Sequence, residues 1–219
     1  MKLKSKKNIH YLRHSSFLAL ALGASLFSHD RAFAQSCTSS GTTLTCSGSG
    51  AGVSQSGSNI NVILDGTSSA MNTGPAQIIN WVTTNNDPMS LTTIGQVNMT
   101  TTISTPLIQL VKSYGNGDLS LHIGGQTNIH QSSNYGGTII YLENTSGMGS
   151  SGNTIVDIAA GAVITGDGIT NPWIAGIQVT HTTNGISSVT NRGSIRINGD
   201  GFGIKKILSN PPALPGRHS

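Results

Sequence analysis

The sequence predicts an all-β fold, a β-solenoid of stacked parallel strands, on three observations. Short alternating apolar segments recur between about residues 115 and 204 at steps of about 17 to 21 residues. Dipeptides that favour tight corners, such as Asn116-Gly117 and Asn184-Gly185, separate these segments. Charged residues make up only 9% of the chain while β-branched residues are frequent, which is unlike a disordered segment.

Residues 1–34 are predicted to be a signal peptide that is absent from the mature protein. Basic residues from Lys2 to Arg13 precede the apolar segment 17–27, which is too short to span a bilayer because spanning needs about 20 residues. An A-x-A motif ends at Ala34, so we expect cleavage between Ala34 and Gln35. The chain is therefore expected to be exported through the inner membrane, with no transmembrane segment left after cleavage.

Loss of this segment reverses the sign of the net charge. The whole chain has 12 Lys and Arg against 8 Asp and Glu, a formal charge of +4. Residues 1–34 hold six of those 12 basic residues and one of the 8 acidic ones, so the mature chain has a formal charge of −1. No basic surface remains to follow a phosphate backbone, which argues against a nucleic-acid partner.

Residues 35–58 are predicted to form an N-terminal cap. This segment is rich in Ser, Thr and Gly and contains both cysteines of the chain, Cys37 and Cys46. In an oxidising compartment such a pair most simply forms a local disulfide. The alternative is a metal site, but two thiolates without a nearby histidine provide too few of the four ligands that zinc needs. We therefore expect a disulfide, no metal and no cofactor.

Residues 59–204 are predicted to form the repeats, about eight coils at the apparent period. Segment 68–90 is less regular, and Trp81 is expected to pack beneath a loop there. The apolar run 106–111 is compatible with a helical turn or with a buried strand. Parallel pairing between successive coils, about 4.8 Å apart, would satisfy the backbone hydrogen bonds along the stack.

Two similar segments support stacked coils over the alternative fold, a β-sandwich. Residues 161–169 and 193–202 align almost position for position, with the same Gly-Asp-Gly corner. They lie about 32 residues apart, which at a period near 20 requires coils of unequal length. A sandwich has strands every 8–12 residues and does not call for matching corners in successive units.

Residues 205–219 are predicted to be a disordered tail that does not continue the repeat. They contain three of the seven prolines of the chain and three of the six basic residues of the mature protein. The abrupt change after Ile204 suggests a truncated or frame-disrupted product.

No motif of the sequence carries a recognisable reaction. Residues 147–152 match G-x-G-x-x-G, but the residues that follow alternate like a strand, whereas a dinucleotide site needs a helix. His122 and His130 are eight positions apart, which is no standard metal-ligand spacing, and we expect both at exposed strand positions. The mature chain holds two further histidines, His181 and His218.

Three aspartates are candidates for glycosidase-type acids. Asp157, Asp167 and Asp200 could serve only if two of the carboxylates faced one sugar bond. Asp167 and Asp200 stand at matching corners, so turn formation explains them more simply. We expect no catalytic residues and no enzymatic activity. The alternative is a polysaccharide lyase or glycosidase.

Taken together, the basic signal peptide, the early C-x8-C pair and the loose repeats, such as residues 189–204, resemble the passenger region of bacterial autotransporters. The resemblance covers residues 35–204. It implies a right-handed parallel β-helix that a C-terminal β-barrel carries to the cell surface, and an adhesin as the commonest function. The 219 residues show no series of amphipathic strands typical of such a barrel, which implies a separate or missing translocator.

The expected function is therefore that of an adhesin-type binding module, and the abrupt change after Ile204 suggests a truncated product that is not anchored. The expected partner is a host cell-surface glycan or a matrix protein. The expected location is the periplasm, the cell surface or the medium, or the outer membrane if a longer form carries a barrel.

Overall fold

The structure is a computed structural model. It describes residues 35–50, 53–55, 61–73, 79–84, 86–132, 137–145, 151–167, 175–199 and 201–208. The signal peptide, the cleavage site after Ala34 and residues 209–219 of the expected tail lie outside the described residues and stay predictions. None of the described residues lies in a helix, and sixteen β-strands account for most of them.

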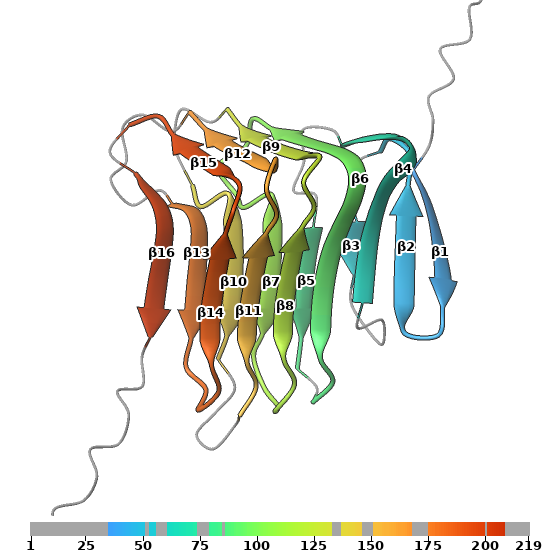
Figure 1. The fold of residues 1–219 in the computed structure, drawn as a ribbon. Helices are drawn as coiled ribbons and strands as arrows, with labels where there is room; N and C mark the ends of the chain where they lie inside the picture. Colours follow the sequence, from blue (N-terminus) through green and yellow to red (C-terminus); the bar gives the residue numbers. More distant parts are fainter. Residues whose placement is uncertain are drawn as a thin grey trace, which may run out of the picture. The chain divides into compact units, whose positions relative to one another are not determined.

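The strands form two sheets (Figure 1). The first sheet contains β1 (Ser36–Ser40), β2 (Thr43–Ser47), β4 (Asn61–Thr73), β6 (Met89–Thr101), β8 (Leu119–Ile123), β9 (Thr127–Gln131), β11 (Thr154–Ile158), β12 (Val163–Gly166), β14 (Ser187–Asn191) and β15 (Ser194–Ile197). The second sheet contains β3 (Val53–Gln55), β5 (Ile79–Thr83), β7 (Ile108–Lys112), β10 (Ile140–Asn144), β13 (Ala175–His181) and β16 (Phe202–Leu208).

Strand pairing is parallel throughout the described part of the chain except between β1 and β2, which pair antiparallel. A β-sandwich of the kind weighed as the alternative is built from antiparallel sheets. The described residues therefore form an all-β fold with mainly parallel sheets, as the sequence predicts.

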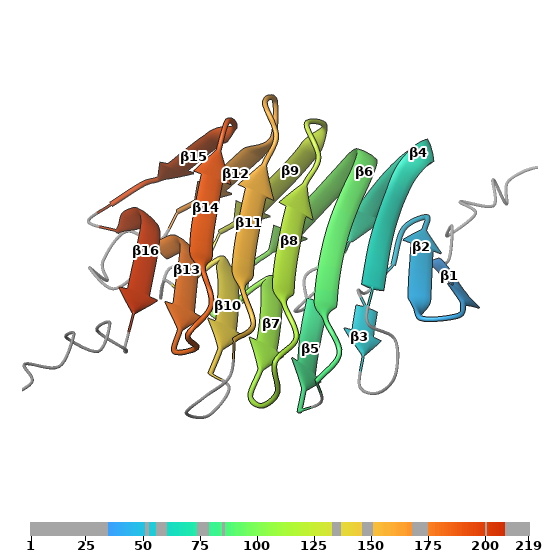
Figure 2. The same cartoon turned by 60° about the horizontal axis from the view of Figure 1, so that its bottom comes forward.

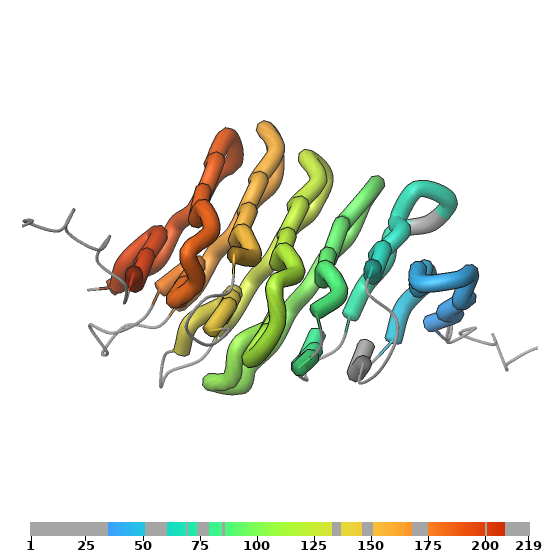
Figure 3. The backbone as a smooth tube through the Cα atoms, turned by 90° about the horizontal axis from the view of Figure 1, so that it is seen from below, coloured from blue at the N-terminus to red at the C-terminus, as the bar shows by residue number. Residues whose placement is uncertain are grey.

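The chain passes from the first sheet to the second and back, so each passage lies beside the previous one as a layer. In the first sheet the order β2-β4-β6-β8-β11-β14 follows the sequence, and β3 to β16 do the same in the second. Figure 2 shows the strands of successive layers side by side, and Figure 3 shows the tube returning on itself layer after layer. The described strands thus define six layers, fewer than the eight expected.

The expected period of about 20 residues is wrong. Ile140 pairs with Ile108 on one side and with Ile177 on the other, so paired positions are 32 and 37 residues apart. In the first sheet Leu119 pairs with Thr154, 35 positions further on. Strands of both sheets follow one another along the chain and show the same apolar pattern. The step of about 20 residues is therefore the distance between successive strands in the sequence, which do not pair with each other in a ladder.

In each strand the side chain of every second residue points inward. These inward residues stack on their paired counterparts in the next layer. A column of this kind in the first sheet runs through Val62, Leu91, Leu121 and Val156, all buried. Burial of each such side chain contributes about 1.5–3 kcal/mol relative to leaving it exposed. The core therefore lies between the two sheets and is continuous from layer to layer.

A glycine pair allows β4 and β6 to bend from one face of the stack to the next without ending. Gly66 pairs with Gly95, which has a φ of 67°, and the register between the two strands shifts after this point. A Cβ on either residue would come closer than 3.0 Å to backbone atoms of the neighbouring layer. In later layers the same corner separates two strands, such as β8 and β9.

The N-terminal hairpin contains the expected disulfide between Cys37 and Cys46. Cys37 lies opposite Cys46 in the β1–β2 pair, and β2 then pairs in parallel with β4. All residues of β1 are exposed, so the hairpin covers the edge of β2 with a polar strand. Pairing in the second sheet already begins with β3, inside the segment 35–58 that was expected to be only a cap.

The repeats do not end at Ile204. Strand β16 continues to Leu208 and pairs with β13 over this length. The strand has a charged residue at an inward position, because Lys206 pairs with the buried Val179. This break in the apolar alternation explains why the sequence pattern suggested a tail from residue 205 onward.

Candidate functional site

Titratable side chains on the outside of the first sheet form a column across three layers. His122 on β8 pairs in register with Asp157 on β11, and Arg192 follows the end of β14. Arg192 donates from one guanidinium nitrogen to both carboxylate oxygens of Asp157, at 2.8 and 3.0 Å. The imidazole Nδ1 of His122 lies 4.0 Å from Oδ2 of the same carboxylate. Exposed pairs of this kind stabilise a fold by no more than about 1 kcal/mol.

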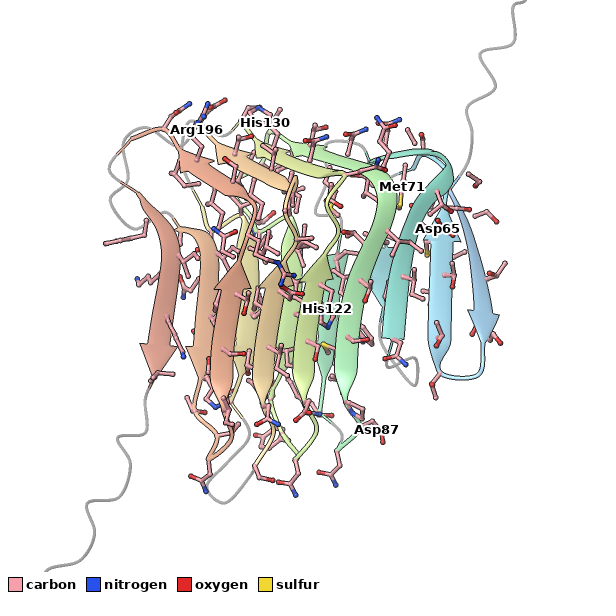
Figure 4. The ribbon with its side chains drawn as sticks, viewed as in Figure 1. Asp65, Met71, Asp87, His122, His130 and Arg196 are labelled. Carbon is pink, nitrogen blue, oxygen red and sulfur yellow. A yellow bond between two sulfur atoms is a disulfide. The ribbon has the colours of Figure 1, made fainter. Side chains whose placement is uncertain are left out.

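A second column follows the neighbouring strands β6, β9, β12 and β15. Thr100, His130, Thr165 and Arg196 occupy paired positions in four successive layers. Nδ1 of His130 and Oγ1 of Thr165 are 2.9 Å apart, a hydrogen bond across the layers. Figure 4 shows His130 and Arg196 at the outer surface of this face.

Asp167, directly after β12, completes this group. Its carboxylate lies 3.5 Å from Nε2 of His130 and accepts a hydrogen bond of 2.9 Å from the Asn198 amide. The side chains of His130 and Asp167 are 41% and 39% exposed, so both can reach a ligand as well as each other. The corner that carries Asp167 therefore presents a carboxylate held in place by two neighbours.

A column of asparagines runs beside the second column on the same face. Asn98 donates to the side-chain oxygen of Asn72 at 3.0 Å, and Asn128 donates to that of Asn98 at 3.1 Å. These three residues pair in register on β4, β6 and β9. Each amide keeps further donor or acceptor capacity, since an amide group has two donors and two lone pairs.

We call these three columns together the outer ridge. It consists of His122, Asp157 and Arg192, then Thr100, His130, Thr165, Arg196, Asp167 and Asn198, and finally Asn72, Asn98 and Asn128. The ridge runs over the corner of the first sheet: the His122 column lies before this corner, and the other two columns lie beyond it. Its side chains combine two carboxylates, two guanidinium groups, two imidazoles, hydroxyls and amides. Successive groups are separated by the strand spacing of about 4.8 Å, so the ridge offers hydrogen-bonding groups in a regular array.

The expected positions of the two outer histidines are confirmed, since His122 and His130 lie at outward positions of β8 and β9. His181 is instead buried, and His218 lies outside the described residues. Strand β11 begins at Thr154, two residues after Gly152, the end of the G-x-G-x-x-G segment. That segment is thus followed by a strand and not by the helix that a dinucleotide site needs.

Asp157 and Asp167 have different partners in the described part of the chain. Asp157 is engaged by Arg192, and Asp167 by Asn198 and His130. No group of three or more His, Cys, Asp or Glu residues suited to a metal ion occurs among the described residues. Asp200 lies outside the described residues. The absence of enzymatic activity stays a prediction.

A buried polar column in the second sheet could not be found from the alternation of the sequence. Lys112, Asn144 and His181 pair in register at the inward end of β7, β10 and β13. Each donates to the backbone carbonyl of a corner: Lys112 to Asp87 at 2.8 Å, Asn144 to Asn153 at 3.3 Å and His181 to Gly185 at 3.0 Å. The column thus holds the corner segments against the core. Its side chains also donate hydrogen bonds to backbone carbonyl groups that have no partner in the β-ladders.

Lys112 makes the stability of the fold depend on pH. Burial lowers the pKa of Lys112 below its usual 10.5, although the charges of Asp87 and Asp118 act in the opposite direction. The unfolded chain then binds more protons between the folded pKa and about 10.5, so stability rises with pH in that window. We expect wild type to gain stability over Lys112→Met as the pH rises from 8 to 10, by at most about 1.4 kcal/mol per pH unit.

Urea unfolding of both proteins at pH 8, 9 and 10 measures this difference. The range stops at pH 10 because burial and a hydrogen bond to Glu143 raise the pKa of Tyr141 to about 12. Above pH 10 the folded state therefore holds the Tyr141 proton more tightly than the unfolded state, which lowers stability as the pH rises. A difference between the two proteins that stays constant with pH would show that Lys112 keeps an ordinary pKa, and one that falls with pH would show a raised pKa; either result contradicts the prediction.

Comparison of the chain with protein-family models, with curated proteins and with solved structures gives no significant match. The described residues contain no helix that is long and apolar enough to cross a membrane.

Proposed function

We propose that the protein is an exported binding module of the adhesin type, and that the outer ridge binds a glycan. The observation that carries this proposal is the outer ridge itself, a regular array of hydrogen-bonding side chains on a rigid surface. A polysaccharide repeats its hydroxyl groups along one direction, and the ridge repeats donors and acceptors along the stack. Each contact is weak, at about 0.5–1.5 kcal/mol, so affinity would come from their number.

We further propose that the six layers belong to a right-handed parallel β-helix of the autotransporter-passenger type. The parallel ladders, the inward columns and the polar hairpin on one edge support this fold. Export is supported by the Cys37–Cys46 disulfide, because disulfides persist mainly in oxidising compartments. The formal charge of −1 that remains without residues 1–34 supports a neutral ligand over a nucleic acid.

A glycan array with the purified, oxidised protein tests the proposal. We expect binding to at least one neutral polysaccharide, and a loss of affinity of about tenfold or more in the double variant His130→Ala, Arg196→Ala, since two or more hydrogen bonds disappear. Gln178→Ala on the outer face of β13 is the matched control and should bind like wild type.

Two results would contradict the assignment. Binding that is equal in wild type and in the double variant would place the ligand elsewhere. Binding to matrix proteins but to none of the glycans would show that the partner is a protein and not a glycan. Circular dichroism of each variant shows whether the fold has been kept.

A further inference from the structure

The mature chain contains three Asn-Gly pairs, at residues 116–117, 184–185 and 198–199. In such a pair the backbone nitrogen of the glycine can attack the side-chain carbonyl carbon of the asparagine, because glycine has no side chain that shields its nitrogen. The two atoms meet only if the asparagine side chain turns toward its own backbone and the peptide group between the residues rotates. The contacts of each pair in the folded chain therefore decide how easily it reacts.

The pair at residues 116–117 is held by the layers on both sides of it. Asn116 donates from its backbone nitrogen to Oδ1 of Asn86 at 3.2 Å, and its own Oδ1 accepts from the backbone nitrogen of Ser151 at 3.3 Å. A Cβ on Gly117 would come closer than 3.0 Å to the carbonyl oxygen of Asp87, so this glycine is packed against the backbone of another corner. Rotation of the peptide group would require the corners to separate.

The pair at residues 184–185 is held through its glycine. The nitrogen of Gly185, the atom that would attack, donates to the hydroxyl of Thr183 at 3.1 Å. The carbonyl oxygen of Gly185 lies 3.0 Å from Nε2 of His181, and both Thr183 and His181 are buried. The attacking nitrogen is therefore engaged, and its release would break hydrogen bonds inside the protein.

The pair at residues 198–199 has contacts on one side only. It follows β15 in the last described layer, and both residues are exposed. Asn198 donates from its backbone nitrogen to the carbonyl of Gly166 at 2.8 Å and from its side chain to the Asp167 carboxylate at 2.9 Å, and both partners belong to the preceding layer. No described residue accepts a hydrogen bond from the nitrogen of Gly199. Turning the Asn198 side chain therefore breaks a single exposed hydrogen bond.

We propose that Asn198 deamidates spontaneously in the folded protein, and that it does so faster than the asparagines of the other two pairs. The nitrogen of Gly199 loses its proton and bonds to Cγ of Asn198. The bond from Cγ to the amide nitrogen breaks, so ammonia leaves and a five-membered succinimide ring remains. Water, the only co-reactant, then opens the ring at one of its two carbonyl groups. Opening at Cγ gives aspartate, and opening at the main-chain carbonyl gives isoaspartate, in which the backbone continues through Cγ.

The product changes the second column of the outer ridge. Aspartate at position 198 has no amide hydrogens, so the hydrogen bond to Asp167 disappears and two carboxylates face each other. The ridge thus loses a donor and gains a negative charge close to His130, which lies 3.5 Å from the Asp167 carboxylate. We expect glycan binding to weaken as the protein ages. This consequence rests on the proposed function, whereas the reaction itself does not.

Peptide mass spectrometry of the full-length oxidised protein, incubated at mildly alkaline pH, tests the proposal. The same protein unfolded in guanidinium chloride is the reference, and there the three pairs should convert at similar rates because each is Asn-Gly. In the folded protein we expect Asn198 to convert at least about tenfold faster than Asn116 and Asn184, since their layers must open first. The rates are measured without a glycan, so failure of the proposed function would leave them unchanged.

Two variants test the assignment. Asn198→Gln should remove the product at this position, because glutamine would have to form a six-membered ring, which closes far more slowly. Thr183→Val frees the nitrogen of Gly185 and should speed the conversion of Asn184 several-fold while that of Asn198 stays the same. The proposal is overturned if Asn198 stays intact while the unfolded reference converts, or if Asn116 or Asn184 converts as fast in the folded wild type. If Thr183→Val does not fold, the wild-type rates still decide.

Discussion

Replacing Gly152 by alanine is expected to lower the free energy of unfolding by about 3 kcal/mol. Gly152 lies at a corner where glycines of three layers are stacked: a Cβ on it would come closer than 3.0 Å to the carbonyl oxygen of Gly117, and one on Gly185 to that of Gly152. The obstructing atoms belong to the backbone, so no side chain can move aside. The layers would have to separate at this corner, which would also strain the hydrogen bond from Thr183 to the Gly152 carbonyl.

Urea unfolding followed by circular dichroism measures the effect, and Gly203→Ala is the matched control. A Cβ on Gly203 would meet only a side-chain carbon of Ile195 at 3.8 Å, an ordinary contact. This control should stay within about 1 kcal/mol of wild type. Equal stability of the two alanine variants would show that the corner does not constrain the layer spacing.

Replacing Trp81 by alanine is expected to cost about 3–5 kcal/mol. Trp81 lies on β5 and is 1% exposed, in register with the buried Leu110. It belongs to the core of the second sheet, whereas the sequence pattern placed it beneath a loop. Its removal would leave a large cavity that cannot close, because β5 is held in place by parallel ladders to β3 and to β7.

Trp81→Phe separates the packing of this side chain from its polar group. The indole Nε1 of Trp81 is buried without a hydrogen-bond partner in the protein, and such a group costs about 1–3 kcal/mol. Phenylalanine keeps most of the apolar volume and removes this group. The phenylalanine variant should therefore be at least about 2 kcal/mol more stable than the alanine variant when both are unfolded in urea. Similar midpoints for both would mean that ring packing contributes little.

The alternation of the sequence was sufficient to predict the strands but not their neighbours. Segments such as 119–123 and 154–158 alternate clearly, and both are strands. Segment 140–144 alternates in the same way but belongs to the other sheet. A strand of either sheet buries the same face in the same core, so periodicity alone cannot assign it. The two similar segments about 32 residues apart came within one residue of the true spacing, since Val163 pairs with Ser194, 31 positions further on.

Polar residues inside the stack were missed for a related reason. Lys112, Asn144 and His181 stand where an alternating pattern predicts an apolar side chain or the end of a strand. They are buried because corner carbonyls of other segments accept their hydrogen bonds, and those partners become neighbours only in the folded chain. The outer histidines were predicted correctly, because an outward polar position needs no partner. Their grouping with Asp157 and Asp167 required the true register.

The unequal layer lengths have an evolutionary consequence. From β10 to β13 the paired residues Ile140 and Ile177 are 37 positions apart, and from β13 to β16 the paired residues Ile177 and Ile204 are only 27 apart. The ladders keep their register across this difference, so the connecting segments take up all of it. Insertions and deletions in those segments can therefore accumulate in descendants without disturbing the core. The lengths of homologous chains would then diverge far faster than their strand patterns. Position-by-position sequence alignment would therefore fail to detect such homologues even at modest divergence.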